Sequence, residues 1–140
     1  MDRSKLEERL KGYFATRDEV VAAYLFGSRA QNRQHPGSDL DLALLLYHQQ
    51  AANAFEYKAQ YVVELGRILK LDIHPVIMNT AGEELLRQVF AKGKCVQVND
   101  QRACALFRIS AYCRIADFDR YRKMAQRGFL DRLRREAAGG

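Results

Sequence analysis

FGSRAQNRQHPGSDLDLALLL, residues 26–46, connects two apolar runs and places Asp39 and Asp41 at the start of the second run. The first run, VAAYLF at residues 21–26, is short and is ended by Gly27, which is typical of a buried strand. The second run alternates its two aspartates with leucines and then becomes fully apolar, so it predicts a second strand. Two buried strands joined by a polar segment are therefore expected at the centre of the fold.

The remaining elements follow from helical periodicity and from turn residues. Gln31–Ser38 is polar and contains Pro36 and Gly37, which indicates a loop or a short helix followed by a turn. Pro75 has no backbone N–H to donate, so the strand that contains it is expected at an edge of the sheet. The predicted elements are strands at residues 21–26, 39–46, 71–78 and 95–98, and helices at 4–16 (capped by Ser4), 51–70, 80–93 (capped by Thr80) and from 99 to a break at Gly128.

These elements predict an α+β fold, in which a small mixed β-sheet is packed with helices and followed by a C-terminal helix. The net charge of +6 lies entirely in the tail, because residues 1–100 contain 13 basic and 13 acidic side chains whereas residues 101–140 contain 10 and 4. We therefore expect a core at 1–100 and a basic helical extension at 101–140 that packs on the core or docks on a partner. A basic tail suits nucleic acid, a membrane surface or an acidic protein, and charge does not choose among them.

Length and composition exclude several classes of protein. A chain of 140 residues is the size of one domain. Its charged start, MDRSKLEERL, is unlike an apolar signal segment, and no later run approaches membrane-spanning length, so we expect a soluble, cytoplasmic protein. Cys95, Cys104 and Cys113 contain no C-x-x-C pair, which favours reduced, mostly buried thiols over disulfides or a zinc site.

Asp39 and Asp41 form a pair of carboxylates with a fixed spacing. Side chains alternate along a strand, so the two point the same way, about 7 Å apart at the backbone, while Leu40 and Leu42 face the core. Two like charges held together repel unless a cation lies between them. Hard oxygen ligands of this kind suit Mg²⁺, which takes the rest of its coordination shell from water and phosphate oxygens. The pair therefore predicts a magnesium-dependent nucleotide site.

The residues before the pair support a phosphate-binding role. Gly27 lets the backbone turn sharply at the end of a buried strand, and Ser28 offers a hydroxyl where free N–H groups can face an anion. Arg29 is either a further phosphate contact or a surface charge. Neither Gly-Ser nor Asp-x-Asp is specific alone, and it is their combination on two strands that indicates a nucleotide site.

Gly27, Ser28, the ten residues that follow them, and then Asp39 and Asp41 reproduce the pattern G-S-x10-D-x-D. This pattern resembles the signature of the nucleotidyltransferases related to DNA polymerase beta. The short chain and the phrase FGSRA resemble the minimal nucleotidyltransferases, the MntA-like antitoxins that pair with HEPN-type toxins. The resemblance covers about residues 4–100 in the order of elements, and the tail is only loosely similar.

The resemblance also implies a third carboxylate on a following strand, and Asp72 has the expected place. An aspartate at a strand edge is ordinary by itself, but with Asp39 and Asp41 in line the catalytic interpretation becomes the stronger one. Relatives usually carry a further glycine soon after GSRA, where this chain has Gln31–Arg33. That difference affects the expected shape of the loop and not the set of carboxylates.

A magnesium-dependent nucleotidyltransferase, and more narrowly a protein adenylyltransferase, is what the resemblance implies. The donor would be ATP, and the acceptor would be a tyrosine hydroxyl of a cognate HEPN ribonuclease toxin that the attached AMP neutralises. The alternatives are a small-molecule nucleotidyltransferase, such as one that modifies an aminoglycoside, and an antitoxin that inhibits by binding alone. The implied site residues are Asp39, Asp41 and Asp72 for catalysis and for two Mg²⁺ ions, and Gly27, Ser28 and Arg29 for the nucleotide.

His74 lies two positions after Asp72 and should share its strand face, so it could approach the carboxylates. The interpretation that the sequence favours is a partly buried strand histidine. Tyr112 and Tyr121 are expected to serve packing or an interface, because they lack the alternation of aromatic and basic residues that single-strand binding uses. Direct binding of nucleic acid therefore stays open.

Overall fold

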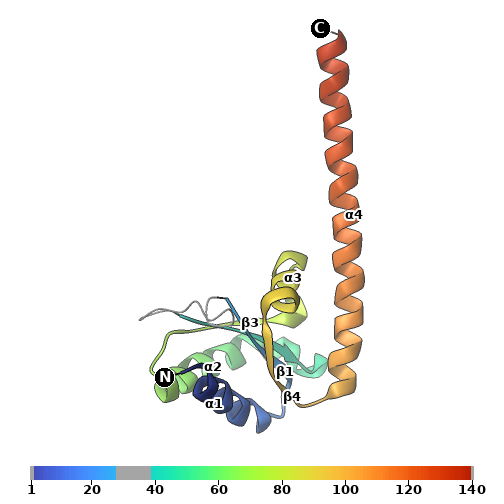
Figure 1. Cartoon of the computed structure of the whole chain (residues 1–140). Helices are drawn as coiled ribbons and strands as arrows, with labels where there is room; N and C mark the ends of the chain where they lie inside the picture. Colours follow the sequence, from blue (N-terminus) through green and yellow to red (C-terminus); the bar gives the residue numbers. More distant parts are fainter. Residues whose placement is uncertain (1, 28–38, 140) are drawn as a thin grey trace.

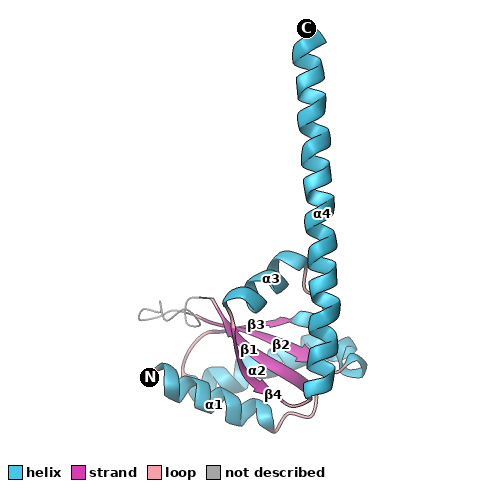
Figure 2. Ribbon diagram, turned by 45° about the vertical axis from the view of Figure 1, so that its right-hand side comes forward, coloured by secondary structure: helices cyan, strands magenta, loops and turns pink. Residues whose placement is uncertain are grey.

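Four strands form one mixed sheet in the computed structural model, which describes residues 2–27 and 39–139. They are β1 (Val20–Phe26), β2 (Leu40–Leu46), β3 (Ile73–Ile77) and β4 (Lys94–Val98). Their order is β3-β2-β1-β4, with β1 antiparallel to both of its neighbours and β2 parallel to β3 (Figure 2). The predicted mixed sheet is confirmed, and so is the edge position of the strand that contains Pro75.

Helices cover both faces of the sheet, as the predicted α+β class requires. They are α1 (Arg3–Ala15), α2 (Ala54–Leu69), α3 (Glu83–Lys92) and α4 (Gln101–Gly139), with short 3-10 turns at His48–Asn53 and Met78–Thr80. α1 and α2 pack on one face, where they bury Leu40 and Leu42, and α3 and the first part of α4 pack on the other, with Ala43 and Leu45 (Figures 1 and 2). The alternation along β2 therefore decides which face each of its side chains joins.

The helix caps differ from those that the sequence predicts. Asp2 caps α1, because its side chain accepts a hydrogen bond of 2.8 Å from the N–H of Lys5, and the predicted cap Ser4 lies inside the helix. Thr80 belongs to a 3-10 turn, and α3 begins after Gly82, which has no side chain to cap it. Both capping-box predictions are therefore wrong, each by less than one helical turn. Neighbouring residues compete for the cap position, and the spacing of the sequence pattern does not decide among them.

α4 continues past Gly128, so the predicted break there is wrong. The helix packs on the sheet through Cys104, Ala111 and Ile115, and its later part projects away from the core with exposed side chains (Figure 1). Two ion pairs also hold it to α3, because Arg87 of α3 pairs with Asp119 and Glu84 of α3 pairs with Arg122. One glycine in an exposed helix costs about 1 kcal/mol relative to alanine, which weakens a long helix without ending it.

Two of the three cysteines also differ from expectation. All three are free thiols, as predicted, but Cys95 and Cys113 are exposed and only Cys104 is buried. Cys95 lies on β4, which is an edge strand, and Cys113 lies on an exposed position of α4.

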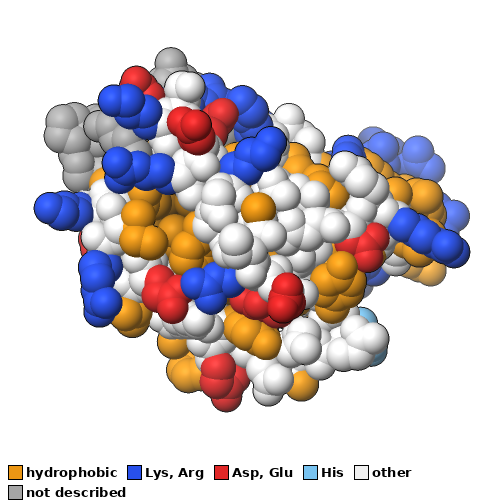
Figure 3. Space-filling model, turned by 90° about the horizontal axis from the view of Figure 1, so that it is seen from below, with side chains coloured by type: hydrophobic (Ala, Val, Ile, Leu, Met, Phe, Trp, Pro, Cys, Tyr) orange, Lys and Arg blue, Asp and Glu red, His pale blue; other side chains and the backbone are white. Residues whose placement is uncertain are grey.

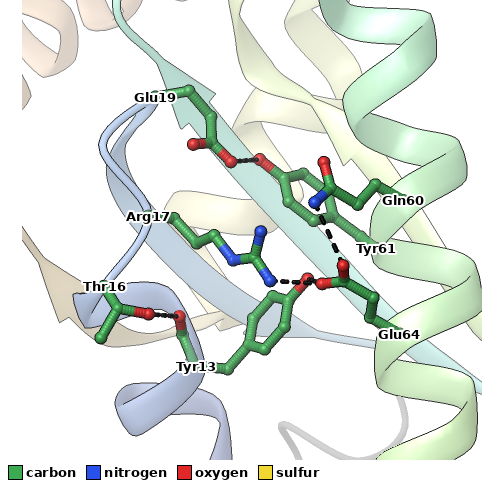
Figure 4. A network of polar contacts seen from close by, with 7 residues as sticks. All are labelled: Tyr13, Thr16, Arg17, Glu19, Gln60, Tyr61 and Glu64. Atoms are coloured by element: carbon green, nitrogen blue, oxygen red, sulfur yellow. Dashed lines mark hydrogen bonds and ion pairs between the residues drawn. The ribbon is translucent and has the colours of Figure 1, made fainter.

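A polar network joins α1 and the residues after it to α2 (Figure 4). Tyr13 and Arg17 both donate to the Glu64 carboxylate, and Tyr61 donates to Glu19 at 2.8 Å. The Tyr13 hydrogen bond contributes most to lowering the pKa of Glu64. Burial, reinforced by the bond to Glu19, raises the pKa of Tyr61. These bonds fix α2, which is the crossover between the parallel strands β2 and β3.

The surface of the core carries both signs of charge. Seen from below, Lys and Arg side chains are interspersed with Asp and Glu rather than gathered in one patch (Figure 3). Of the helices in the described part of the chain, none has the length and apolar character needed to cross a membrane.

Candidate nucleotide and metal site

Two carboxylates lie together at the start of β2. Asp39 is exposed directly ahead of the strand, and Asp41, its second residue, is half-buried. Leu40 and Leu42, which alternate with them, are fully buried on the opposite face. The predicted arrangement is confirmed in this respect, because the leucines anchor the strand and the aspartates point together away from that core.

Gly27 follows β1 beside this pair. Its φ angle of +79° is in the region that favours glycine, and a Cβ built on it would lie 2.3 Å from the Oδ2 atom of Asp41. Phe26, the residue before it, pairs with Asp41 across the antiparallel ladder. Glycine is thus required twice, once for the turn and once to leave room for the carboxylate. Ser28 and Arg29, the other predicted nucleotide contacts, lie outside the described residues.

The environment of Asp41 disfavours its charge. Burial raises the pKa of the Asp41 carboxyl, His74 opposes that shift and Asp39 adds to it. The ionised form of a half-buried carboxylate that lies near a second carboxylate is stabilised by any cation placed between the two. This is the electrostatic character expected of a cation site.

His74 lies beside the aspartate pair. The parallel register of β2 and β3 pairs Asp41 with His74, and the Nε2 atom of His74 lies 3.4 Å from the Oδ2 atom of Asp39. Its side chain is 56% exposed, so the favoured interpretation of a partly buried strand histidine is wrong. The two-residue alternation of the strand was the signal that placed it near the site. Its partner could not be read from the sequence, because the register between the two strands is set by the helix that crosses between them.

Asp72 lies one step ahead of β3, with its backbone beside the pair. Its carbonyl accepts a hydrogen bond of 2.8 Å from the N–H of Leu40, which ties the two strand ends together. Asp72 is exposed and is one of the residues around an open cavity of about 440 Å³, with Val62, Gly66 and Lys70 from α2 and its end. Within residues 2–27 and 39–139, no three His, Cys, Asp or Glu side chains form a group that could hold a metal ion. The role of Asp72 as a third ligand therefore remains a proposal.

Asp39 and Asp41 suit a divalent cation of the magnesium type. Each offers hard carboxylate oxygens, they share one face, and the missing Cβ of Gly27 keeps the space beside Asp41 open. Mg²⁺ needs only one or two protein carboxylates when phosphate and water supply its other ligands. The residues present therefore fit the ion, and they fit it best together with a phosphate group.

The comparison with protein families agrees with this geometry. The family model described as polymerase beta, nucleotidyltransferase matches residues 8–102, which is more than half of the chain. The chain belongs to this nucleotidyltransferase family. The matched segment begins in α1 and ends at the start of α4, so it contains Gly27, both aspartates and Asp72. A comparison with curated protein sequences gives no match.

Solved structures with the same fold are toxin-antitoxin complexes. One, of a toxin-antitoxin with AMP-PNP, aligns with a TM-score of 0.62 at 22% identity, covering 95% of this nucleotidyltransferase and 98% of that chain. A mutant MntA-HpeT toxin-antitoxin has a TM-score of 0.61 at 20% identity with the same coverage. The tri-AMPylated Shewanella oneidensis HEPN toxin in complex with MNT antitoxin has a TM-score of 0.58 at 20% identity, covering 94% and 98%. At these identities the likeness shows a shared fold along nearly the whole chain.

Proposed function

We propose that this nucleotidyltransferase transfers AMP from ATP to a tyrosine hydroxyl of a cognate HEPN ribonuclease toxin and thereby neutralises it. The observation that carries the proposal is the contact between Gly27 and Asp41. In a member of the nucleotidyltransferase family, a glycine turn that makes room for one of two paired carboxylates is suited to a nucleotide and its cation.

The donor and the partner are supported by proteins of the same fold. One of them is a toxin-antitoxin with AMP-PNP, an ATP analogue, and another contains a tri-AMPylated HEPN toxin with its MNT antitoxin. Their alignments cover 94% or more of this chain, so they include most of α4. We therefore propose ATP as the donor and a HEPN toxin as the partner.

In the proposed mechanism, the chain positions charged groups and contributes no covalent chemistry of its own. Asp39 and Asp41 would hold Mg²⁺, and Asp72 would be its third ligand and the acceptor of the hydroxyl proton. Bound Mg²⁺ would offset phosphate charge and lower the pKa of the acceptor hydroxyl. The turn at Gly27, with Ser28 and Arg29, holds the phosphates so that the tyrosine oxygen attacks the α-phosphorus in line. The new oxygen–phosphorus bond forms as the bond to the β-phosphate breaks, and pyrophosphate leaves.

The basic helix α4 is the proposed docking element for the toxin. Its part beyond Asp119 has exposed side chains, among them the apolar Met124, Phe129 and Leu133. Residues 120–136 contain seven basic and two acidic side chains, so a second copy of the same segment would be repelled. An acidic helical surface on the toxin is the partner that this combination of charge and apolar side chains fits.

Labelled ATP tests the proposal directly. The full chain is incubated with ATP labelled at the α-phosphate, Mg²⁺ and a candidate HEPN toxin, and label on a tyrosine of that toxin is expected. Label on an added aminoglycoside, with none on the protein, would support the small-molecule alternative. Replacing both aspartates, Asp39→Asn with Asp41→Asn, should abolish labelling and RNase neutralisation. If the double variant labels and neutralises as the original chain does, the mechanism is wrong.

Inhibition by binding alone is the second candidate, and one observation favours it. Asp72 does not join Asp39 and Asp41 in a three-ligand group among the described residues, and His74 lies beside Asp39 instead. A chain that inhibits by binding would form a stable complex with the toxin and silence it without ATP. Neutralisation measured with and without ATP separates the two functions.

A further inference from the structure

Lys92 lies beside the end of β1, on the side of that strand away from Asp41. β1 is the central strand between β2, which carries Asp41, and β4. β4 begins at Lys94, which pairs with Leu25, so the two residues ahead of β4 lie alongside the last residues of β1. Gly27, directly after β1, therefore has a carboxylate on one side and the end of α3 on the other.

Gly93 makes this close approach possible. A Cβ built on Gly93 would lie 2.4 Å from the carbonyl oxygen of Val89 and 3.3 Å from that of Leu25. A larger residue would have to distort the end of α3, to which Val89 belongs, and would also crowd the backbone of β1 at Leu25. The glycine thus brings Lys92, the last residue of the helix, against the strand end that leads into the Gly27 turn.

A small open cavity joins these residues. Phe26, Gly27, Gln88 and Lys92 line a space of about 260 Å³. Gln88 and Lys92 are four residues apart on α3, so they lie on the same side of the helix. In the described part of the chain, no acidic side chain lies within ion-pair distance of Lys92. The cavity therefore places one cation and one amide beside Gly27.

We propose that Lys92, assisted by Gln88, binds the terminal phosphate of the donor nucleoside triphosphate. The inference rests on the proposed function, because it takes the α-phosphate to lie at the aspartate pair. The chain of phosphates then extends from Asp41 across Gly27, and the far side of Gly27 is lined by Lys92. A triphosphate beside two carboxylates brings together many negative charges, and a lysine ammonium is a common partner for a terminal phosphate.

A purely structural role for Lys92 makes different predictions. A cation in the last turn of a helix also interacts favourably with the helix dipole. In that role, its loss would lower thermal stability and leave the affinity for every nucleotide unchanged. If Lys92 contacts the terminal phosphate, its loss should weaken the binding of a nucleoside triphosphate more than that of a monophosphate. The experiment compares these two affinities.

Calorimetric titration of the full chain with AMP-PNP and with AMP, both with Mg²⁺, tests the inference. Lys92→Gln should weaken AMP-PNP binding about tenfold, the loss of one charge-assisted hydrogen bond, and change AMP binding less than about twofold. Lys92→Arg should restore most of the AMP-PNP affinity. Lys94→Gln is the matched control, because Lys94 pairs with Glu7 of α1 at 2.8 Å and does not line the cavity, so the substitution should leave both affinities unchanged.

The outcomes separate this inference from the proposed function. Equal AMP-PNP affinity in the original chain and in Lys92→Gln overturns the inference, and so does an equal loss for AMP-PNP and AMP. If AMP-PNP binding depends on Lys92 but the toxin receives no label, the phosphate contact stands and the proposed acceptor is wrong. If the original chain binds neither nucleotide while it remains folded, both proposals fail.

Discussion

The Asp41 carboxylate occupies the space that a side chain on Gly27 would need, because a Cβ built on the glycine would lie 2.3 Å from the Oδ2 atom of the aspartate. The two residues are brought together by the antiparallel pairing of β1 with β2, which sets Phe26 opposite Asp41. A residue at the end of one strand thus controls the position of a candidate metal ligand on the next. Substitutions at Gly27 should therefore affect ligand binding through Asp41.

Gly27→Ala tests this relationship. The new Cβ must displace the Asp41 carboxylate, and a φ of +79° adds about 1 kcal/mol of backbone strain. We expect binding of AMP-PNP with Mg²⁺ to weaken at least tenfold and the melting temperature to fall by a few degrees. Calorimetry and thermal unfolding measure the two effects separately.

Gly12→Ala is the control for that substitution. Gly12 lies in α1 with no atom within 4 Å of the position of an added Cβ, so alanine should raise the stability of the helix slightly. Its nucleotide affinity should match the original chain. Unchanged affinity in Gly27→Ala as well would contradict the link between the turn and the carboxylate.

Asp41→Asn should increase stability in the absence of metal. The substitution removes a half-buried charge that faces Asp39 and leaves the shape of the side chain almost unchanged. We expect a melting temperature in EDTA that is equal to or higher than that of the original chain. The gain in melting temperature on adding MgCl₂ with AMP-PNP should be present in the original chain and lost in the variant.

A large fall in melting temperature in EDTA would contradict this prediction. It would mean that the Asp41 carboxylate stabilises the metal-free fold. Its charge would then not be a cost that the bound cation offsets. Asp18→Asn, at an exposed aspartate ahead of β1, is the comparison for the effect of losing one negative charge.

Glu64→Gln tests the polar network between α1 and α2. The hydroxyl of Tyr13, followed by other donors, lowers the pKa of Glu64 below its ordinary value near 4.5. A carboxyl whose pKa is lower in the folded state adds stability above its ordinary pKa and loses it as the pH falls through the folded value. We therefore expect Glu64→Gln to be less stable than the original chain at pH 7, with the difference shrinking as the pH falls below the ordinary pKa of the carboxyl and through its lower value in the folded chain.

Denaturant unfolding of both chains between pH 3 and 7 measures that difference. Glu56→Gln is the control on the same helix, because Glu56 is exposed and outside this network. If the free energies of unfolding of Glu64→Gln and the original chain differ by the same amount over this pH range, the ionised carboxylate is not the source of the difference.

Local patterns predicted much of the fold, whereas the contacts of the site needed long-range pairing. The alternation of Leu40 and Leu42 with the aspartates predicted which face is buried, because strand geometry alone decides it. The approach of Gly27 to Asp41 depends on the register of two strands separated by more than ten residues. The position of His74 depends on a crossover through α2, which the local sequence does not reveal.

The helix caps and the predicted break at Gly128 show that local sequence rules can also fail for purely local features. Asp2 and Ser4 are both good capping residues, and the structure selects the first by a hydrogen bond that the spacing to Glu7 does not predict. The expected break rests on the low helix propensity of one residue, Gly128. The backbone hydrogen bonds of the other residues in this helix of 39 residues keep it continuous. A local penalty of about 1 kcal/mol is too small to end such a helix.

Gly128→Ala tests the continuity of α4. Because the helix passes through this position and an added Cβ would meet no atom within 4 Å, alanine should stabilise the outer part of α4 by about 1 kcal/mol. Amide hydrogen exchange should slow for residues on both sides of position 128, and helical content measured by circular dichroism should stay the same or rise. If Gly128 ended the helix, alanine would slow exchange on one side only or not at all. Gly82→Ala, at the N-cap of α3 where an added Cβ also meets open space, is the control and should leave exchange in α4 unchanged.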